Sequence, residues 1–311
     1  MAGHPLRPLI AVVGPTASGK SALALRLAEA RGGEIVSCDS LQVYRGFDVG
    51  SAKAGAAERA RARHHLLDVA SAEEAFSAAE YARQARAALE GIAARGALPV
   101  VAGGTGLYLR ALLQGLFEGP SRDAALRRRF EGLAERFGDA RLHRLLGRVD
   151  APAAARIEVR DRVRVVRALE VYWSSGRPIT AHQQAPLAPL QGYRVLVLGL
   201  DPPREALRRA VEERTEAMFA GGLLEEARAL RARHGDVRAL QAIGYRQAIA
   251  LLDGATDAAQ ARRDMVAATM RYAKRQMTWF RHQADVRWFA APEAAFAAAL
   301  AWLQEGEGAR G

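Results

Sequence analysis

The amino-acid sequence predicts an α/β fold with a parallel-sheet core that carries helices on both faces. Short apolar runs that end at glycines or polar turns alternate with stretches of helical spacing over the first third of the chain. Half of the 311 residues are hydrophobic and a quarter are charged. This composition is enough to bury a core, and it excludes a disordered or collagen-like chain.

Three strands and three helices are expected before residue 115. The expected strands cover residues 8–13, 34–38 and 98–102. The expected helices cover residues 21–31, 81–95 and 105–114. Consecutive strands joined through helices pair in parallel, which places helices on both faces of the sheet.

The middle of the chain interrupts this alternation. Residues 120–189 have a helical, arginine-rich pattern that ends in an expected loop at 183–189, and an apolar run at 193–200 then returns as a strand. Beyond it the pattern is almost wholly helical. We therefore expect three regions: an α/β core of residues 1–119 plus 190–230, a helical insertion of residues 120–189, and a helical C-terminal region of residues 231–311.

Composition also limits the compartment. No apolar run reaches the ~20 residues that a membrane span needs, and the N-terminal residues show no cleavage-site pattern. Cys38 is the only cysteine, so disulfides and cysteine-based zinc sites are excluded, and we expect it to be a small buried residue. His64 and His65 are expected in a loop. The sequence predicts a cytoplasmic protein without a membrane anchor.

The formal net charge of +11 is concentrated in two segments. Residues 122–177 carry 14 arginines against 8 acids, and residues 262–287 carry 7 basic residues against 2 acids. Only Lys20, Lys53 and Lys274 are lysines among the 45 basic residues, so the abundance of arginine itself reflects coding bias. Two basic regions on a neutral body indicate a polyanionic partner, while solvated helix faces are the alternative.

A phosphate-binding loop pattern lies between the first expected strand and the first expected helix. Glycines let the backbone wrap a phosphate, the helix N-terminus adds positive potential, Lys20 neutralises charge and the Ser21 hydroxyl suits Mg²⁺. The core is therefore expected to resemble that of P-loop NTPases. The predicted diphosphate- or nucleotide-binding residues are Gly14, Pro15, Thr16, Ala17, Ser18, Gly19, Lys20 and Ser21.

Two further strand ends border the same expected cleft. Asp39 follows the second strand, where a carboxylate would bind Mg²⁺ or accept a proton from a nucleophile, or would form an Asx turn or helix cap. Thr105 lies among glycines after the third strand. It would supply a neutral hydrogen bond to a ligand or cap the following helix, and taken alone the cap is the simpler interpretation.

Basic and aromatic residues recur at helical spacing between Arg271 and Arg281. This pattern suits phosphate contacts with aromatic support, and it is equally compatible with an amphipathic helix that docks through its aromatic residues.

Taken together, these motifs resemble the tRNA dimethylallyltransferase (tRNA isopentenyltransferase) family. The resemblance rests on residues 14–21, 39–44, 65–68, 103–108, 164–170, 243–247 and 274–281, in the family's order. It departs at Arg63, where the family commonly has proline, which affects only a loop conformation.

The resemblance implies transfer of a dimethylallyl group from dimethylallyl diphosphate to N6 of the adenosine 3′-adjacent to the anticodon in tRNA. It implies that the phosphate loop holds the diphosphate with Mg²⁺, and that the protein binds the tRNA anticodon stem-loop, with a monomer expected. By match, Asp39 is the general base, Thr105 contacts the target base and Arg214 is a site arginine.

The resemblance also implies which residues contact tRNA. The matching positions are Asp39, Ser40, Leu41, Gln42, Val163, Arg164, Val165, Val166, Arg167, Ala242, Ile243, Gly244, Tyr245, Arg246, Gln247, Lys274, Arg275, Gln276, Met277, Thr278, Trp279, Phe280 and Arg281.

Three alternative functions are weighed against this one. An adenylate dimethylallyltransferase would not need the helical insertion or the basic C-terminal block. A P-loop nucleotide kinase is disfavoured by the Gly-Gly-Thr strand end and by the lack of an Arg-rich lid next to a carboxylate. A non-enzymatic RNA-binding ATPase remains, and comparing the binding of ATP with that of dimethylallyl diphosphate would test it.

Overall fold

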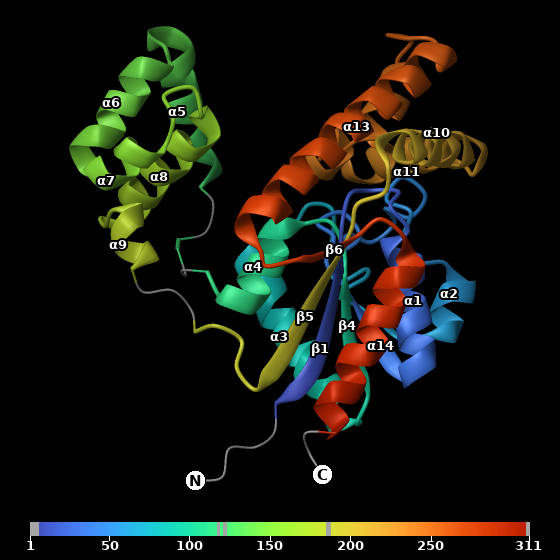
Figure 1. The fold of residues 1–311 in the computed structure, drawn as a ribbon. Coiled ribbons are helices and arrows are strands. Elements are labelled where there is room, and N and C mark those ends of the chain that lie inside the picture. The colour runs from blue at the N-terminus through green and yellow to red at the C-terminus, as the bar shows by residue number, and fades with distance from the viewer. Residues whose placement is uncertain (1–5, 117–118, 121–122, 185–187, 309–311) are drawn as a thin grey trace. The chain divides into compact units, whose positions relative to one another are not determined.

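The structure is a computed structural model that describes residues 6–116, 119–120, 123–184 and 188–308. Residues 1–5, Arg122 at the start of the first basic segment, and 185–187 of the expected loop lie outside this description. The described chain has the predicted α/β fold (Figure 1). It divides into two units, Met1–Leu113 with Leu190–Gly311, and Gln114–Pro189.

The first unit is built on a six-stranded sheet whose strand pairs are all parallel. The strand order across the sheet is β3-β2-β4-β1-β5-β6. The strands are β1 (Arg7–Val13), β2 (Gly33–Ser37), β3 (His64–His65), β4 (Leu98–Ala102), β5 (Tyr193–Leu200) and β6 (Arg287–Phe289). The strands expected at 8–13, 34–38, 98–102 and 193–200 are confirmed to within one residue at each end.

Helices cover both faces of this sheet (Figure 1). Leu9, Ala11 and Val13 of β1 belong to one buried cluster with α3 and α4, and Ile10 and Val12 belong to another with α1 and α14. This alternation follows from the two-residue period of a strand. The helices are α1 (Lys20–Arg31), α3 (Ala78–Ala94), α4 (Gly106–Gln114) and α14 (Pro292–Gly308), with the short α2 (Ala56–Arg61) near β3.

The remaining helices of this unit enclose a separate hydrophobic cluster. It contains Phe47 and, from these helices, Met218, Leu223, Tyr245 and Met265. These helices are α10 (Arg204–Ala220), α11 (Leu223–His234), the 3-10 helix Arg238–Gln241, α12 (Tyr245–Leu252) and α13 (Ala258–Gln283).

Two strands differ from the sequence prediction. His64 and His65, expected in a loop, form β3, in which Ile35 of β2 pairs with His64. The range 231–311, expected to be helical, contains β6, which pairs with β5 through Leu198 and Arg287. Both strands are too short for an apolar run to mark them, and their neighbours in the sheet determine them. Cys38 is confirmed as a buried residue, with 2% of its surface exposed.

The second unit consists of helices alone in its described part. Phe130, Leu146, Val165 and Leu169 contribute to its buried core. Its helices are α5 (Ala124–Phe137), α6 (Asp139–Val149), α7 (Ala151–Arg156), α8 (Arg162–Ser175) and α9 (Ile179–Gln183). No described helix of either unit is long and apolar enough to cross a bilayer.

A fully buried carboxylate organises the second unit. Glu170 on α8 accepts a hydrogen bond from the Asp123 amide at 2.6 Å and pairs with Arg167 at 3.0 Å and with Arg127 at 3.6 Å. These contacts connect the beginning of α5 to α8. Two of the arginines in the basic segment therefore neutralise an internal charge.

We predict that Glu170→Ala destabilises this helical unit by about 3 kcal/mol, because removing one partner of a buried ion pair leaves the other charge uncompensated. Hydrogen exchange of the backbone amides of α5 and α8 in the intact chain measures the effect. The exposed Glu158, changed to Ala, is the matched control, and equal protection in the two variants would contradict the prediction.

Candidate functional site at the carboxyl ends of the strands

The loop between β1 and α1 has the geometry of an anion-binding cradle. Ala17 and Gly19 have positive φ angles of 63° and 86°. Within the described residues, the amides of Ala17, Gly19, Lys20 and Ser21 donate no hydrogen bond to the backbone. Free amides at a helix N-terminus attract a phosphate, and the left-handed Ala17 is the kind of local strain that functional loops retain.

Close packing explains the first glycine of the loop. A Cβ atom on Gly14 would lie 2.8 Å from the Leu200 carbonyl oxygen of β5 and 3.0 Å from Ser18 Oγ. The Ser18 hydroxyl is buried and has no hydrogen-bond partner in the described part of the chain. The loop therefore contains an unused polar group as well as unused amides.

Three charged side chains influence one another beside this loop. Lys20 donates a hydrogen bond to the Pro15 carbonyl at 3.0 Å. Burial and, to a smaller extent, the positive charge of Arg214 lower the pKa of Lys20 to about 8, against the opposing influence of the negative charge of Asp39. Burial likewise lowers the pKa of Arg214, again opposed by Asp39. The structure thus brings together two predicted cations and the predicted carboxylate.

Asp39 uses one of its two carboxylate oxygens for local structure. Oδ1 accepts hydrogen bonds from the amides of Leu41 at 2.8 Å and Gln42 at 3.4 Å, which is an Asx turn. Oδ2 has no hydrogen-bond partner among the described residues, and Asp39 lines a cavity. The two interpretations of Asp39 are therefore compatible, because each concerns a different oxygen.

Thr105 lies beside Asp39 across the ends of β2 and β4. Its hydroxyl accepts a hydrogen bond from the Ser40 amide at 3.0 Å and lies 3.4 Å from Ser40 Oγ. The hydroxyl contacts no described amide of α4, so the simpler expectation of a helix cap is wrong for this side chain.

Gln276 of α13 connects two parts of the site. Its Oε1 accepts a hydrogen bond from the Thr16 amide at 3.0 Å, and its Nε2 donates one to the Gly104 carbonyl at 2.9 Å. Only 6% of the Gln276 surface is exposed. A Cβ atom on Gly104 would lie 2.1 Å from Gln276 Nε2, so this glycine makes room for the contact.

A cavity of about 630 Å³ lies among these groups. Its wall contains eleven of the residues that the sequence singled out, which are Thr16, Asp39, Ser40, Leu41, Arg214, Ala242, Ile243, Arg246, Arg271, Tyr272 and Arg275. The volume is within the usual range of 300–1,000 Å³ for ligand sites.

The rest of the wall comes from residues that the sequence analysis missed. They are Gly50, Ser51, Val211, Thr215, Met218, Gln241, Met265, Ala268 and Thr269. On α10 and α13 they recur at three- and four-residue spacing, so a helical periodicity was present in the sequence. That spacing also describes an ordinary core face, and only the packing of the two helices distinguishes the two cases.

Several residues expected to contact tRNA lie beneath the surface. Val165, Val166, Tyr245, Gln247, Gln276 and Phe280 expose between 0% and 6% of their surface. Gly244 is also buried. These residues pack beneath the surface, because side chains so deeply buried offer almost no accessible area to a large partner.

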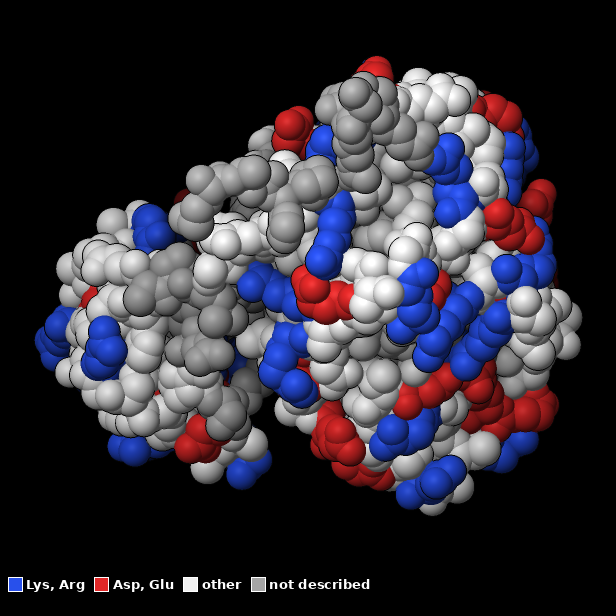
Figure 2. Space-filling model, turned by 90° about the horizontal axis from the view of Figure 1, so that it is seen from below, with Lys and Arg blue, Asp and Glu red and all other residues white. Residues whose placement is uncertain are grey.

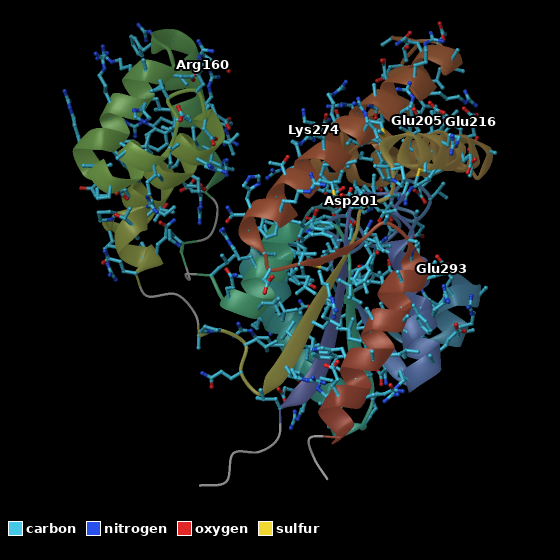
Figure 3. The ribbon with its side chains drawn as sticks, viewed as in Figure 1. Arg160, Asp201, Glu205, Glu216, Lys274 and Glu293 are labelled. Atoms are coloured by element: carbon cyan, nitrogen blue, oxygen red, sulfur yellow. The ribbon has the colours of Figure 1, made fainter. Side chains whose placement is uncertain are left out.

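Besides Ser40 and Arg246, exposed candidates lie on α8 and α13. On α8, Val163 is 70% exposed and Arg164 pairs with Asp161, but this helix belongs to the second unit, which the structure describes separately from the cavity. On α13, Arg281 pairs with Asp201, whereas Lys274 has no ion-pair partner among the described residues (Figure 3). Basic and acidic side chains are interspersed on the face that Figure 2 shows, so the excess charge is not concentrated there.

Ser21 and Gln42 lie outside the main cavity. Both border a second cavity of about 40 Å³, which Ser37 also lines. Ser37 donates a hydrogen bond to Gln42 at 2.9 Å. The candidate metal ligand Ser21 therefore borders this smaller cavity together with two polar side chains that bind each other.

The fold and the site define a class of protein. A doubly wound parallel sheet with a free anion cradle and a carboxylate at its strand ends, close to a lysine and to an arginine of a neighbouring helix, has the features of a site for a phosphorylated ligand beside a carboxylate. The chain belongs to the IPP transferase family, whose family model matches residues 42–283. The resemblance inferred from the sequence motifs is thereby confirmed.

Individual relatives agree with this assignment. The chain is 52% identical to a tRNA dimethylallyltransferase of Anaeromyxobacter sp. (strain Fw109-5) over 91% of this chain and 95% of that protein. It is 48% identical to a protein of the same name from Koribacter versatilis, over 90% of this chain and 92% of that one.

Solved structures show the same fold. A tRNA isopentenylpyrophosphate transferase of Bacillus halodurans matches with a TM-score of 0.67 and 34% identity, over 97% of each chain. A eukaryotic dimethylallyltransferase that acts on tRNA matches with a TM-score of 0.77 over 96% of this chain and 80% of that one. At 23% identity, the second match supports the fold alone.

We predict that pyrophosphate binding weakens as the pH rises above 8. The Lys20 amine is protonated below its pKa of about 8 and loses its charge above it, while a bound anion favours the protonated form. One linked proton corresponds to a loss of affinity of about fivefold between pH 8 and pH 9.

Calorimetric titration of wild type and Lys20→Arg tests this, because arginine keeps its charge throughout the range and controls for the ionisation of pyrophosphate itself. Identical pH profiles for the two proteins would contradict the prediction.

Proposed function

We propose that this chain transfers a dimethylallyl group from dimethylallyl diphosphate to N6 of the adenosine immediately 3′ of the anticodon in tRNA. One observation carries the proposal: Asp39, whose Oδ1 alone is used in the turn, lines the same cavity as Thr16 of the phosphate loop and Arg214. The names of the relatives support it. An acceptor in tRNA also gives a role to the exposed basic residues of α13, which a small-molecule acceptor would not need.

The phosphate loop and its cations act on the leaving group. As the bond between the allylic carbon and oxygen breaks, negative charge grows on the diphosphate. The free amides of residues 17 and 19–21, the Lys20 ammonium and the Arg214 guanidinium are already in place to stabilise that charge. Groups that need no rearrangement lower the barrier most effectively.

Asp39 acts on the nucleophile. The adenine amine is a weak nucleophile that must lose a proton as its new bond to carbon forms, and Asp39 Oδ2 is free to accept that proton. The Asx turn at Oδ1 fixes the orientation of the carboxylate. Burial and the nearby Asp39 charge raise the pKa of Tyr272 to about 12, so this phenol stays a neutral hydrogen-bond donor in the same cavity.

The residues present suit a Mg²⁺ ion that would be held mainly by oxygen atoms of the bound diphosphate. No cluster of three or more histidine, cysteine or acidic residues suited to a metal occurs within the described ranges. The Ser21 hydroxyl would contribute one ligand and the diphosphate oxygens most of the others, in keeping with the usual preference of Mg²⁺ for substrate phosphates. When bound, the ion supplies positive charge to the departing diphosphate.

The target base must leave its stack to enter the cavity, as enzymes that modify bases require. We further propose that the enzyme acts as a monomer in the cytoplasm. The single buried cysteine is compatible with a reducing compartment.

Mass spectrometry of unmodified tRNA after incubation with the protein, dimethylallyl diphosphate and Mg²⁺ tests the proposal. We expect one dimethylallyl group on the adenosine next to the anticodon. A tRNA with guanosine at that position is the control. Phosphoryl transfer from ATP without any change in the tRNA would replace the proposal with a kinase or an ATPase.

Asp39→Asn should lower the single-turnover rate by roughly 10²–10⁴-fold, because the amide cannot accept the proton. We expect the affinities for tRNA and pyrophosphate to stay near those of the wild type, since the amide oxygen can still form the turn. The exposed Asp285, changed to Asn, is the control with the same loss of charge. A wild-type rate in Asp39→Asn would remove the general base from the mechanism.

Lys274→Ala should raise the dissociation constant of tRNA for cognate and mismatched tRNA alike, and reduce the slope of log K against log salt by roughly 0.7–0.9. Arg164, Arg167 and Arg281 already pair with carboxylates, so we expect smaller effects from their replacement. Titrations at two salt concentrations measure both quantities, with Arg208→Ala as the control because Arg208 pairs with Glu212 on α10. An unchanged slope for Lys274→Ala would contradict a phosphate contact.

A further inference from the structure

A carboxylate outside the cavity holds the loop that forms part of its wall. Glu226 on α11 accepts hydrogen bonds from three consecutive backbone amides, those of Asp48 at 3.1 Å, Val49 at 2.8 Å and Gly50 at 3.0 Å. Its Oε1 also accepts a hydrogen bond from the Tyr245 hydroxyl. Four donors on one carboxylate define its position and that of the loop at the same time.

Tyr245 fixes this arrangement from the other side. Its ring is fully buried and packs edge-on against Phe47, with the ring centroids 5.0 Å apart. A Cβ atom on Gly50 would lie 2.4 Å from the Tyr245 ring, so the loop lies directly on the tyrosine. Burial and the negative charge of Glu226 raise the pKa of Tyr245, and its hydroxyl therefore remains a donor.

The loop that Glu226 holds, residues 48–51, ends at the Ser51 carbonyl, which contacts Arg214. The Ser51 carbonyl accepts hydrogen bonds from Arg214 Nη2 at 3.3 Å and from Gln42 Nε2 at 3.3 Å. Ser51 Oγ donates to the Phe47 carbonyl at 2.6 Å, which closes the turn. For the Arg214 side chain, the Ser51 carbonyl is the one hydrogen-bond acceptor found among the described residues.

Arg214 needs such an anchor because its neighbour is also a cation. Lys20 and Arg214 repel each other, and the positive charge of Arg214 accordingly lowers the pKa of Lys20. Without a fixed acceptor, a long guanidinium side chain would turn toward solvent before any diphosphate binds. A correctly held carbonyl keeps it directed into the cavity and removes that ordering cost from ligand binding.

We propose that Glu226 is a positioning residue for the diphosphate site, acting through the backbone of residues 48–51 to hold the Ser51 carbonyl that orients Arg214. The inference rests on the proposed function in that Arg214 binds the diphosphate of the donor. It assigns no contact between Glu226 and substrate. The influence passes from α11 through the loop to α10, which lies beside α13 (Figure 1).

A double-mutant cycle on pyrophosphate binding tests this without requiring transfer activity. Glu226→Gln keeps the size of the side chain and removes its charge. One of the two accepting oxygens becomes an amide nitrogen, which cannot accept a hydrogen bond. We expect it to weaken pyrophosphate binding about tenfold in the wild-type background and less than twofold in the Arg214→Ala background, since the orientation of an absent arginine costs nothing.

Glu225→Gln is the matched control. Glu225 is the neighbouring, exposed carboxylate, and no contact joins it to residues 48–51 in the described part of the structure. We expect this variant to bind pyrophosphate as the wild type does. Equal losses for Glu226→Gln in both backgrounds, or no loss in either, would overturn the proposal.

Tyr245→Phe provides an independent variant should Glu226→Gln fail to fold. It removes one donor to Glu226 and leaves the ring packed, so we expect a smaller loss of about threefold that also disappears in the Arg214→Ala background. In the transfer assay, both variants should raise the KM for dimethylallyl diphosphate more than they lower kcat. A loss that persists without Arg214 would assign these residues to general stability.

The outcome is separate from that of the proposed function. If wild-type protein modifies no tRNA, the proposed reaction fails, while the binding cycle still reports whether Glu226 acts on the anion site through Arg214. If wild-type protein modifies tRNA and the cycle is additive, only the positioning role of Glu226 fails.

Discussion

The two hydrogen bonds of Gln276 are the interaction on which the site depends most. The side chain comes from α13, and its partners are the Thr16 amide of the phosphate loop and the Gly104 carbonyl after β4. Three segments far apart in the sequence are thereby held at fixed distances. Because the Gln276 side chain is buried, water cannot replace either hydrogen bond. Loss of the side chain would therefore leave the Thr16 amide and the Gly104 carbonyl unpaired.

The glycines at the strand ends follow from the same constraint. Gly104 and Gly106 both have negative φ angles, so backbone conformation does not require glycine at either position. A Cβ atom would meet Gln276 at 2.1 Å in the first case and the Trp279 ring at 2.2 Å in the second. Gly104 and Gly106 of the Gly-Gly-Thr-Gly segment are thus required by a helix that begins more than 150 residues later, whereas Gly103 makes room for the Cys38 carbonyl. The glycines are evident in the sequence, but the side chains of α13 that pack against them are not.

This explains which parts of the site the sequence could predict. The phosphate loop, Lys20 and the Asp39 strand end are local: each follows from a strand, a turn and a helix within a few residues, and parallel topology brings their ends to one edge. The walls on α10 and α13, the buried state of Gln276 and Phe280, and the contacts of Glu226 depend on which helices pack together. The short strands β3 and β6 were not predicted for the same reason: they form through pairing with neighbouring strands and carry no apolar run of their own.

The contribution of the arginines to the surface charge likewise depends on tertiary contacts that the sequence does not reveal. The excess of positive charge at residues 122–177 indicated a polyanion footprint, yet Arg127 and Arg167 there contact the buried Glu170 and Arg162 pairs with Asp139. An arginine that already has a carboxylate partner must break that pair before it gains from a phosphate, so its net contribution to binding is reduced. Lys274, with no ion-pair partner among the described residues, has no such contact to give up. It is also one of only three lysines in a chain whose basic residues are otherwise arginine. For binding a polyanion, the number of uncommitted charges is therefore a better guide than the formal total, and on α13 the structure identifies one of them.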